Sequence, residues 1–209
     1  MLEARDLTIR HLGPMRLSVA RGVCIALSGP SGAGKSLILR ALADLEPNGG
    51  TVTLDGIERE RFSAPEWRRQ VGYLAADAGW WAATVGEHMA DTDAARALLP
   101  RLHLPDDALA WAVSRLSTGE RKRLALVRLL IQAPDFLLLD EPASGLDPEA
   151  AGAVDTLVQA HQAAGAGILL VTHDVHQRDH LADRLLTLRD GTLAATTASD
   201  TRSRVEAPA

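Results

Sequence analysis

Short apolar runs recur along the chain, separated by glycine- and proline-rich turns and by stretches of helix-forming residues. Runs of four or five apolar residues are typical of parallel strands that are buried on both faces. The stretches between them indicate helical crossovers. Core strands are predicted at 23–27, 136–139 and 168–171, with a further one at 70–74, and helices at 37–42, 124–131 and 148–164.

Other segments alternate between apolar and polar residues, which is typical of strands with one solvated face. The segment from Leu2 to Val19 predicts two short strands that turn at Gly13-Pro14. Residues 51–54 predict a strand that is followed by a hairpin turn at Asp55-Gly56, and residues 184–195 predict a closing hairpin. We therefore expect a small antiparallel sheet beside the core.

Helix formers dominate residues 84–111, where two prolines interrupt them. This composition predicts a small helical lobe, over about 77–130, inserted into the core. The fold class is therefore α/β: a mostly parallel core sheet with a flanking antiparallel β subdomain and an inserted helical subdomain, over residues 1–195. The small, polar residues of the tail, 196–209, are expected to be poorly ordered.

The composition is that of an ordinary soluble globular protein, with 46% hydrophobic residues, 23% charged residues and a net charge of -5. This charge gives no sign of a nucleic-acid partner. No apolar run approaches the roughly 20 residues that cross a bilayer, and the N-terminus lacks a signal-peptide pattern, so we expect a cytoplasmic chain. The single cysteine, Cys24, excludes an internal disulfide and is expected to be a buried strand residue.

A glycine-rich loop, GPSGAGKS, follows the first core strand and precedes a helix. It matches the phosphate-binding pattern GxxxxGK[ST], which arises by chance in roughly one chain in a hundred of this length. Its backbone N–H groups and the helix N-terminus suit a polyphosphate. Lys35 would reach the β- and γ-phosphates, and the Ser36 hydroxyl would ligate Mg²⁺. The predicted nucleotide-binding residues are Gly29, Pro30, Ser31, Gly32, Ala33, Gly34, Lys35 and Ser36.

Two carboxylates, Asp140 and Glu141, follow the buried strand at 136–139. We expect Asp140 to lie near the Mg²⁺ and Glu141 to orient or deprotonate a water that attacks the γ-phosphate. Taken alone, the pair could equally be an acidic turn at a strand end. A phosphate-binding loop in the same chain favours the catalytic interpretation, since the two halves of such a site require each other.

Three further motifs make a specific resemblance. The segment from Leu116 to Glu120, LSTGE, resembles the LSGGQ signature of ATP-binding-cassette (ABC) ATPases and lies just before the acidic strand. Ser144-Gly145-Leu146-Asp147 resembles the D-loop of that family, and His173 resembles its switch histidine. With the glycine loop and the acidic strand, five motifs stand in the family's order across residues 2–195.

The new motifs also have purely structural interpretations. The signature segment could be only a helix start, with Ser117 or Thr118 as the N-cap and Glu120 in the first turn. His173 could be a strand-end histidine with a structural hydrogen bond. The order of the five motifs favours the functional interpretation, because all levels of the pattern then agree.

The resemblance implies a P-loop ATPase that hydrolyses ATP with Mg²⁺ to drive a membrane transporter. Two chains, identical or similar, would face each other head to tail, with ATP between the glycine loop of one and Ser117 and Gly119 of the other. Asp147 would also contact the nucleotide site. The catalytic residues would be Lys35, Glu141 and His173, the last holding the γ-phosphate and the attacking water.

The resemblance also implies a separate membrane permease, which would keep the chain at the inner face of the cell membrane. Trp80 and Trp81 lie where cassettes of this type receive a helix of the permease. We expect one of these indoles to be buried and the other to be offered to the partner. The short chain looks like the compact cassettes of small exporters.

The chain departs from the family pattern at two places. Ala76 stands where the family has a glutamine that reaches Mg²⁺ and water, although Asp77 could substitute for it. This departure predicts slower or differently coupled hydrolysis, and leaves open a second function, an ATP-clamped binding module with little turnover. The aromatic residue that stacks on adenine is also missing, and His11 and Arg10 are the candidates in its place.

Overall fold

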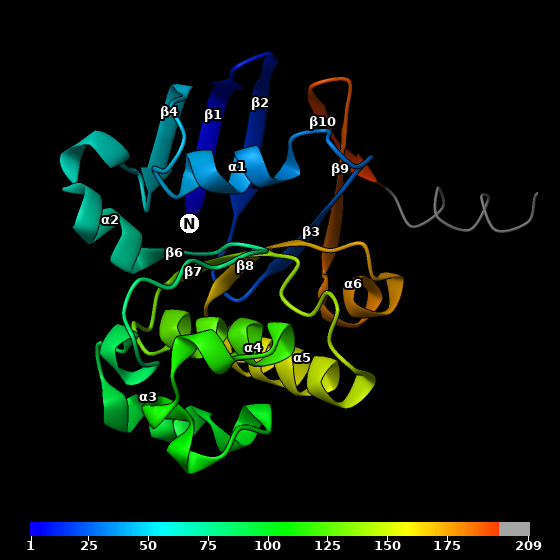
Figure 1. Ribbon diagram of the computed structural model, residues 1–209. Helices are drawn as coiled ribbons and strands as arrows, with labels where there is room; N and C mark the ends of the chain where they lie inside the picture. Colours follow the sequence, from blue (N-terminus) through cyan, green and yellow to red (C-terminus); the bar gives the residue numbers. More distant parts are fainter. Residues whose placement is uncertain (197–209) are drawn as a thin grey trace, which may run out of the picture.

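A six-stranded sheet runs through the middle of the molecule (Figure 1) in the order β10-β9-β3-β8-β7-β6. This is a computed structural model, and it describes residues 1–196. Strands β9, β3, β8, β7 and β6 are parallel, and β10 closes the sheet as an antiparallel edge. The strands are β3 (Cys24–Ser28), β6 (Val71–Leu74), β7 (Phe136–Asp140), β8 (Gly167–Val171), β9 (Arg184–Arg189) and β10 (Thr192–Thr196). The predicted mostly parallel core is confirmed.

A second, antiparallel sheet has the order β2-β1-β4-β5. Its strands are β1 (Leu2–Ile9), β2 (Leu12–Val19), β4 (Gly49–Leu54) and β5 (Ile57–Glu58). The predicted turn at Gly13-Pro14 is wrong: the chain turns at Arg10 and His11, and Gly13 lies inside β2. Gly13 is needed for a close approach instead, because a side chain there would collide with the Leu7 carbonyl.

The described residues form six α-helices (Figure 1): α1 (Lys35–Leu42), α2 (Ala64–Gln70), α3 (Thr92–Leu98), α4 (Thr118–Leu130), α5 (Pro148–Ala163) and α6 (Val175–Leu181). Helix α4 begins six residues before the predicted 124–131, because Ser117 caps it. Short 3-10 helices lie at Arg59–Arg61, Gly86–His88, Pro100–Leu102, Asp106–Ala110 and Val113–Arg115. The helical lobe is therefore less regular than its composition suggested.

The core sheet is buried on both faces, which explains its continuous apolar runs. In β7, Leu137 and Leu139 pack with α4 and α5, while Phe136 and Leu138 pack with α1 and the antiparallel sheet. Strand β8 alternates in the same way. Helix α1 contacts β1 as well as β6, β7 and β8, so it lies between the two sheets. The position of the glycine loop before α1 is thereby set by contacts of the helix with both sheets.

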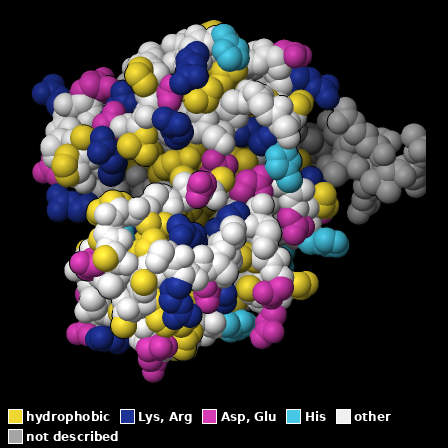
Figure 2. Space-filling model, viewed as in Figure 1, with side chains coloured by type: hydrophobic (Ala, Val, Ile, Leu, Met, Phe, Trp, Pro, Cys, Tyr) yellow, Lys and Arg dark blue, Asp and Glu magenta, His cyan; other side chains and the backbone are white. Residues whose placement is uncertain are grey.

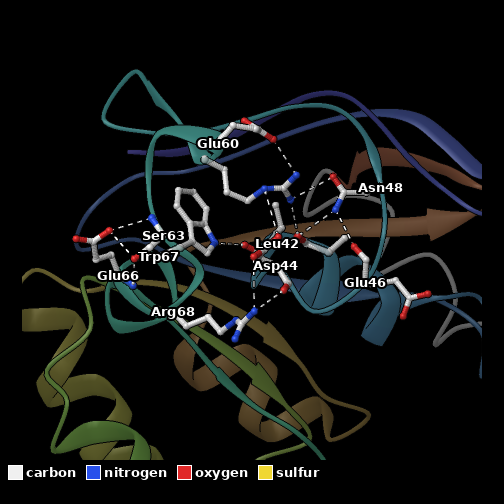
Figure 3. Close-up of polar contacts among 11 residues, drawn as sticks. Leu42, Asp44, Glu46, Asn48, Glu60, Ser63, Glu66, Trp67 and Arg68 are labelled. Carbon is white, nitrogen blue, oxygen red and sulfur yellow. Dashed lines mark hydrogen bonds and ion pairs between the residues drawn. The ribbon is translucent and has the colours of Figure 1, made fainter.

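Polar contacts hold the C-terminal end of α1 (Figure 3). The indole Nε1 of the buried Trp67 donates to the Leu42 carbonyl oxygen at 2.8 Å. Trp67 is carried by α2, which begins with a capping box between Ser63 and Glu66. Arg68, also on α2, reaches Asp44 just beyond α1. These contacts tie α1 to α2, a helix that the apolar pattern did not predict.

Cys24 is fully buried at the start of β3, and burial raises the pKa of its thiol to about 12. It is a structural residue, as expected.

Except for Thr196 at the end of β10, the predicted tail lies outside the described residues. Within residues 1–196, no helix has the length and apolar character needed to cross a membrane.

Candidate active site

The glycine loop joins the end of β3 to the start of α1, as predicted. Lys35 is only 6% exposed, and its Nζ donates to the carbonyl oxygens of Gly29, at 2.9 Å, and Pro30, at 3.0 Å. The ammonium is therefore held against the glycine loop, where it would bind phosphates together with the loop. At Gly29, with φ 145°, a side chain would collide with the Leu188 carbonyl. Ser36 is exposed on the first turn of α1.

The N-terminal end of α1 is free to receive an anion. Its N-cap is Gly34, which offers no capping side chain, and its first turn contains no acidic residue. Helices α4 and α5, in contrast, are capped by Ser117 and Asp147. The uncapped N–H groups of α1 keep their hydrogen-bonding capacity and the positive end of the helix dipole. The loop residues therefore fit a polyphosphate.

Asp140 ends β7 and is 4% exposed. Its Oδ2 accepts a hydrogen bond of 3.4 Å from the hydroxyl of Tyr73 on the neighbouring strand β6. Burial is the largest cause that raises the pKa of Tyr73 to about 12, so the phenol stays a neutral donor. Four lone-pair directions on the carboxylate leave further acceptor capacity, which suits a divalent cation.

Glu141 and His173 meet at the ends of β7 and β8. The Glu141 backbone has φ 52°, a left-handed conformation, and its N–H donates to the Val171 carbonyl at 2.9 Å. The carboxylate lies 3.5 Å from His173 Nε2, and its other oxygen accepts from the His173 backbone N–H at 3.5 Å. Glu141 Oε1 is buried and accepts no hydrogen bond from the described residues. A proton acceptor is thereby left available.

The signature segment begins α4. Ser117 is the N-cap, its Oγ accepts from the Glu120 N–H at 3.2 Å, and the Glu120 carboxylate accepts from the Ser117 N–H at 2.8 Å. The capping interpretation of this segment is thus correct for Ser117. Ser117 is exposed, and neither it nor Gly119 lines the hollow beside the glycine loop, which is formed by residues 11–12, 30–33 and 189–191.

The D-loop segment lies next to the signature helix. A side chain at Gly119 would stand 3.3 Å from the Leu146 side chain. Asp147 is exposed and caps α5, and the N–H of Ala150, donating to its Oδ1 at 2.9 Å, is the main cause that lowers its pKa. A groove of about 750 Å³ separates this segment from His173 and α6. In the view of Figure 2, acidic and basic side chains lie together along the seam that crosses the middle of the molecule.

Ala76 lines the same cavity as Glu141. A cavity of about 330 Å³ is lined by Ala76, Asp77, Lys122 and Glu141, among others. The prediction that Ala76 stands at the position of the family's glutamine stays a prediction. Asp77 lines the same cavity, and its substitution for the glutamine stays a prediction.

The two candidates for the adenine contact lie in different surroundings. His11 is exposed at the hollow beside Pro30 and Ser31 of the glycine loop. Arg10 points its guanidinium to Glu46 instead, with Nη2 2.7 Å from the carboxylate. The arrangement favours His11, because Arg10 is already engaged in an ion pair.

The two tryptophans separate as predicted. Trp80 is half-buried and packs on the core around α4, whereas Trp81 is 75% exposed. Arg128 of α4 lies over both rings, 4.7 Å and 5.0 Å from their centroids. The ring Nε2 of buried His88 accepts a hydrogen bond from the backbone N–H of Trp81 at 2.9 Å, and this bond fixes the backbone at Trp81.

The functional contacts of Tyr73 and Lys122 were not predicted. The sequence predicts Tyr73 only as a strand residue, although its place in β6, beside the strand that ends in Asp140, puts it within reach of that carboxylate. Lys122 follows the signature motif, and its Nζ bonds to the carbonyl oxygens of Glu141, at 3.4 Å, and Ser144, at 2.6 Å. Its only sequence signal is that it is one of the two lysines in the chain.

Comparison with known proteins agrees with this geometry. Residues 12–144 match the family described as ABC transporter. The chain is 36% identical over 207 residues to the Phosphate import ATP-binding protein PstB 2 of Natronomonas pharaonis, covering 86% of this chain and 72% of that protein. It is 34% identical over 212 residues to the Thiamine import ATP-binding protein ThiQ of Shigella flexneri, covering 93% and 90%.

The fold agrees as well. A solved structure described as an ATP binding subunit of an ABC transporter superposes with a TM-score of 0.86 at 27% identity, covering 98% of this chain and 93% of that one. A dimeric ATP-binding cassette bound to ADP and Pi has a TM-score of 0.82 at 23% identity, covering 94% and 98%, a likeness of fold.

The fold and the site define a P-loop ATPase with an α/β core. The chain belongs to the ABC transporter family, in which it is an ATP-binding subunit that hydrolyses ATP.

Proposed function

We propose that the chain is the ATP-hydrolysing subunit of an import transporter and that it drives a separate permease by dimerising head to tail on ATP. The observation that carries this proposal is that one chain brings together only half of an ATP site. Within the described residues, the glycine loop, Asp140, Glu141 and His173 gather at the strand ends, while the exposed signature helix start lies apart from the loop hollow. The relatives reported above are named import proteins, which favours import over the export that the short chain suggested.

In this proposal three side chains perform the reaction. Lys35 binds the β- and γ-phosphates with its ammonium. Glu141 takes a proton from the attacking water or orients it, because its buried Oε1 accepts no hydrogen bond from the described residues. His173, 3.5 Å from that oxygen, contacts the γ-phosphate and holds the water from the other side. These groups stabilise charge and position the water for in-line attack.

Ser36 and Asp140 are the residues proposed to hold Mg²⁺. Asp140 is a buried carboxylate with spare acceptor capacity, and Ser36 offers an exposed hydroxyl on α1. When bound, Mg²⁺ supplies positive charge that neutralises the phosphate oxygens. Oxygen donors of this kind are the ligands that Mg²⁺ prefers.

A second chain, identical or similar, would complete the site. Its Ser117 and Gly119 would face the γ-phosphate with the positive end of α4, and Asp147 would lie at the same interface. Exposure of Ser117 and Asp147 supports this arrangement, since both side chains are open to a partner. The binding-module alternative gains no support, because the relatives are import ATP-binding subunits and such subunits hydrolyse ATP.

The permease is proposed to dock at Trp81 and to hold the chain at the inner face of the membrane. We expect Trp81→Ala to weaken co-purification with the membrane protein by about tenfold, because exposed aromatic anchors dominate interfaces. The basal ATPase of the isolated chain should stay within about twofold, since Trp81 is remote from the glycine loop in sequence and does not line the hollow beside that loop.

The control for this test is Trp111→Ala, which removes a half-buried indole from the same lobe. Pull-down with a tagged chain from solubilised membranes measures the effect. Equal recovery of the membrane protein with Trp81→Ala and with the unaltered chain would contradict the docking site.

A further inference from the structure

Lys122 joins the signature helix to the turn that carries the catalytic carboxylate. Its Nζ donates to the Ser144 carbonyl oxygen at 2.6 Å and to the Glu141 carbonyl oxygen at 3.4 Å. The Ser144 N–H also donates to the Glu141 carbonyl, at 3.3 Å. One ammonium therefore spans both ends of the turn from Glu141 to Ser144, and this turn leads into the D-loop.

The turn needs such support because its first residue is held in an unfavourable conformation. Glu141 has φ 52°, which costs free energy for a residue with a side chain and persists only where neighbouring contacts impose it. The N–H of Glu141 is fixed by Val171 in β8. Its carbonyl is fixed by Ser144 and Lys122, so Lys122 is the only side chain among the described residues that hydrogen-bonds this backbone.

Among the residues that the structure describes, the side of the turn that faces β6 offers no other side chain that holds Glu141 in place of Lys122. The cavity of about 330 Å³ beside Glu141 is lined on that side by Leu74, Ala75, Ala76, Asp77 and Ala78. Within the described residues, none of these side chains hydrogen-bonds Glu141 or Lys122. The link between the helical lobe and the catalytic carboxylate therefore runs through α4.

The residue type at position 122, a lysine rather than an arginine, also fits the contact with two carbonyl oxygens. The chain has 22 lysines and arginines together, and only Lys35 and Lys122 are lysines. Arginine presents a planar fork, whereas lysine concentrates its donors on one atom. A single Nζ between two carbonyl oxygens is an arrangement that a guanidinium reproduces only in part.

We propose that Lys122 is a positioning residue for ATP hydrolysis, which sets the orientation of Glu141 and the start of the D-loop relative to the signature helix. The proposal rests on the role of Glu141 in the proposed function. Within the described residues, Lys122 makes no hydrogen bond to the glycine loop or to His173, so its effect should fall on the rate of the chemical step rather than on nucleotide binding.

The test compares steady-state ATP hydrolysis by full-length Lys122→Met, Lys122→Arg and Arg123→Met. Methionine keeps the apolar stem and removes the ammonium, and we expect kcat to fall about tenfold while KM for ATP stays within about twofold. Arginine keeps the charge and should give an intermediate kcat. Arg123→Met is the matched control, because Arg123 donates to Leu102 and Gly119 but not to the catalytic turn.

Thermal unfolding of each variant separates positioning from folding. If Lys122→Met is folded at the assay temperature and retains the kcat of the unaltered chain, the inference is wrong. If Arg123→Met lowers kcat as much as Lys122→Met does, the effect belongs to the packing of α4, and the inference is likewise overturned.

Glu141→Gln, assayed alongside, distinguishes this failure from failure of the proposed function. If Lys122→Met keeps the kcat of the unaltered chain while Glu141→Gln is inactive, the positioning role of Lys122 is refuted and the proposed ATPase function stands. An active Glu141→Gln refutes the catalytic assignment itself.

Discussion

Replacing Glu141 by glutamine is expected to lower ATP hydrolysis by about two to four orders of magnitude, which is the usual contribution of a general base. The amide has nearly the same shape but cannot accept the proton of the attacking water. Within the described residues, Glu141 makes no hydrogen bond or ion pair with Lys35 or the glycine loop, so ATP binding should remain within about threefold of the unaltered chain. Steady-state phosphate release and equilibrium binding of ATP measure the two quantities.

The matched control is Glu149→Gln, which makes the same chemical change on an exposed residue of α5. Its rate should equal that of the unaltered chain. If Glu141→Gln hydrolyses ATP at the normal rate, Glu141 is not the base, and another group must activate the water.

Replacing Lys35 by alanine should weaken ATP binding by about a hundredfold or more, because a buried ammonium that meets phosphate oxygens is removed. Hydrolysis should be lost with binding. The folded state should change little in stability, since the two hydrogen bonds that disappear end on loop carbonyl oxygens that water can reach.

Titration with ATP measures this loss, and Arg40→Ala is its control. Arg40 is an exposed cation on the same helix, paired with Glu46, and its removal should leave the affinity unchanged. Normal ATP affinity in Lys35→Ala would show that the glycine loop does not bind the phosphates in the way proposed.

Most of the core could be predicted because its signals are local. The runs at 136–139 and 168–171 are apolar without interruption, since their alternate residues enter two different cores. The glycine loop and the acidic strand end are likewise contiguous in sequence. Parallel pairing of β3, β7 and β8 then brings them to one edge without further information.

The errors arose where a local pattern was opposed by a tertiary contact. Gly13-Pro14 carries a strong turn signal, but the neighbouring Leu7 carbonyl demands a glycine inside a strand. The apolar pattern alone places the start of α4 too late, because the polar residues at its beginning are held by the Ser117 capping box rather than by apolar packing. Propensity alone does not record either constraint.

The site contacts that escaped prediction join residues far apart in the chain. Tyr73 reaches Asp140 only through the register of β6 against β7, and Lys122 reaches Ser144 only because α4 packs beside the D-loop. Such contacts depend on packing between elements, which periodicity along the chain does not encode.

The central claim is that each ATP site is divided between two chains. The most direct test measures molecular mass by light scattering, with and without ATP, in the Glu141→Gln background, where turnover is blocked. We predict an ATP-dependent dimer with one ATP per chain, and a monomer that still binds ATP when Ser117→Arg is added. A dimer that persists with Ser117→Arg, or loss of ATP binding to that monomer, would contradict the divided site.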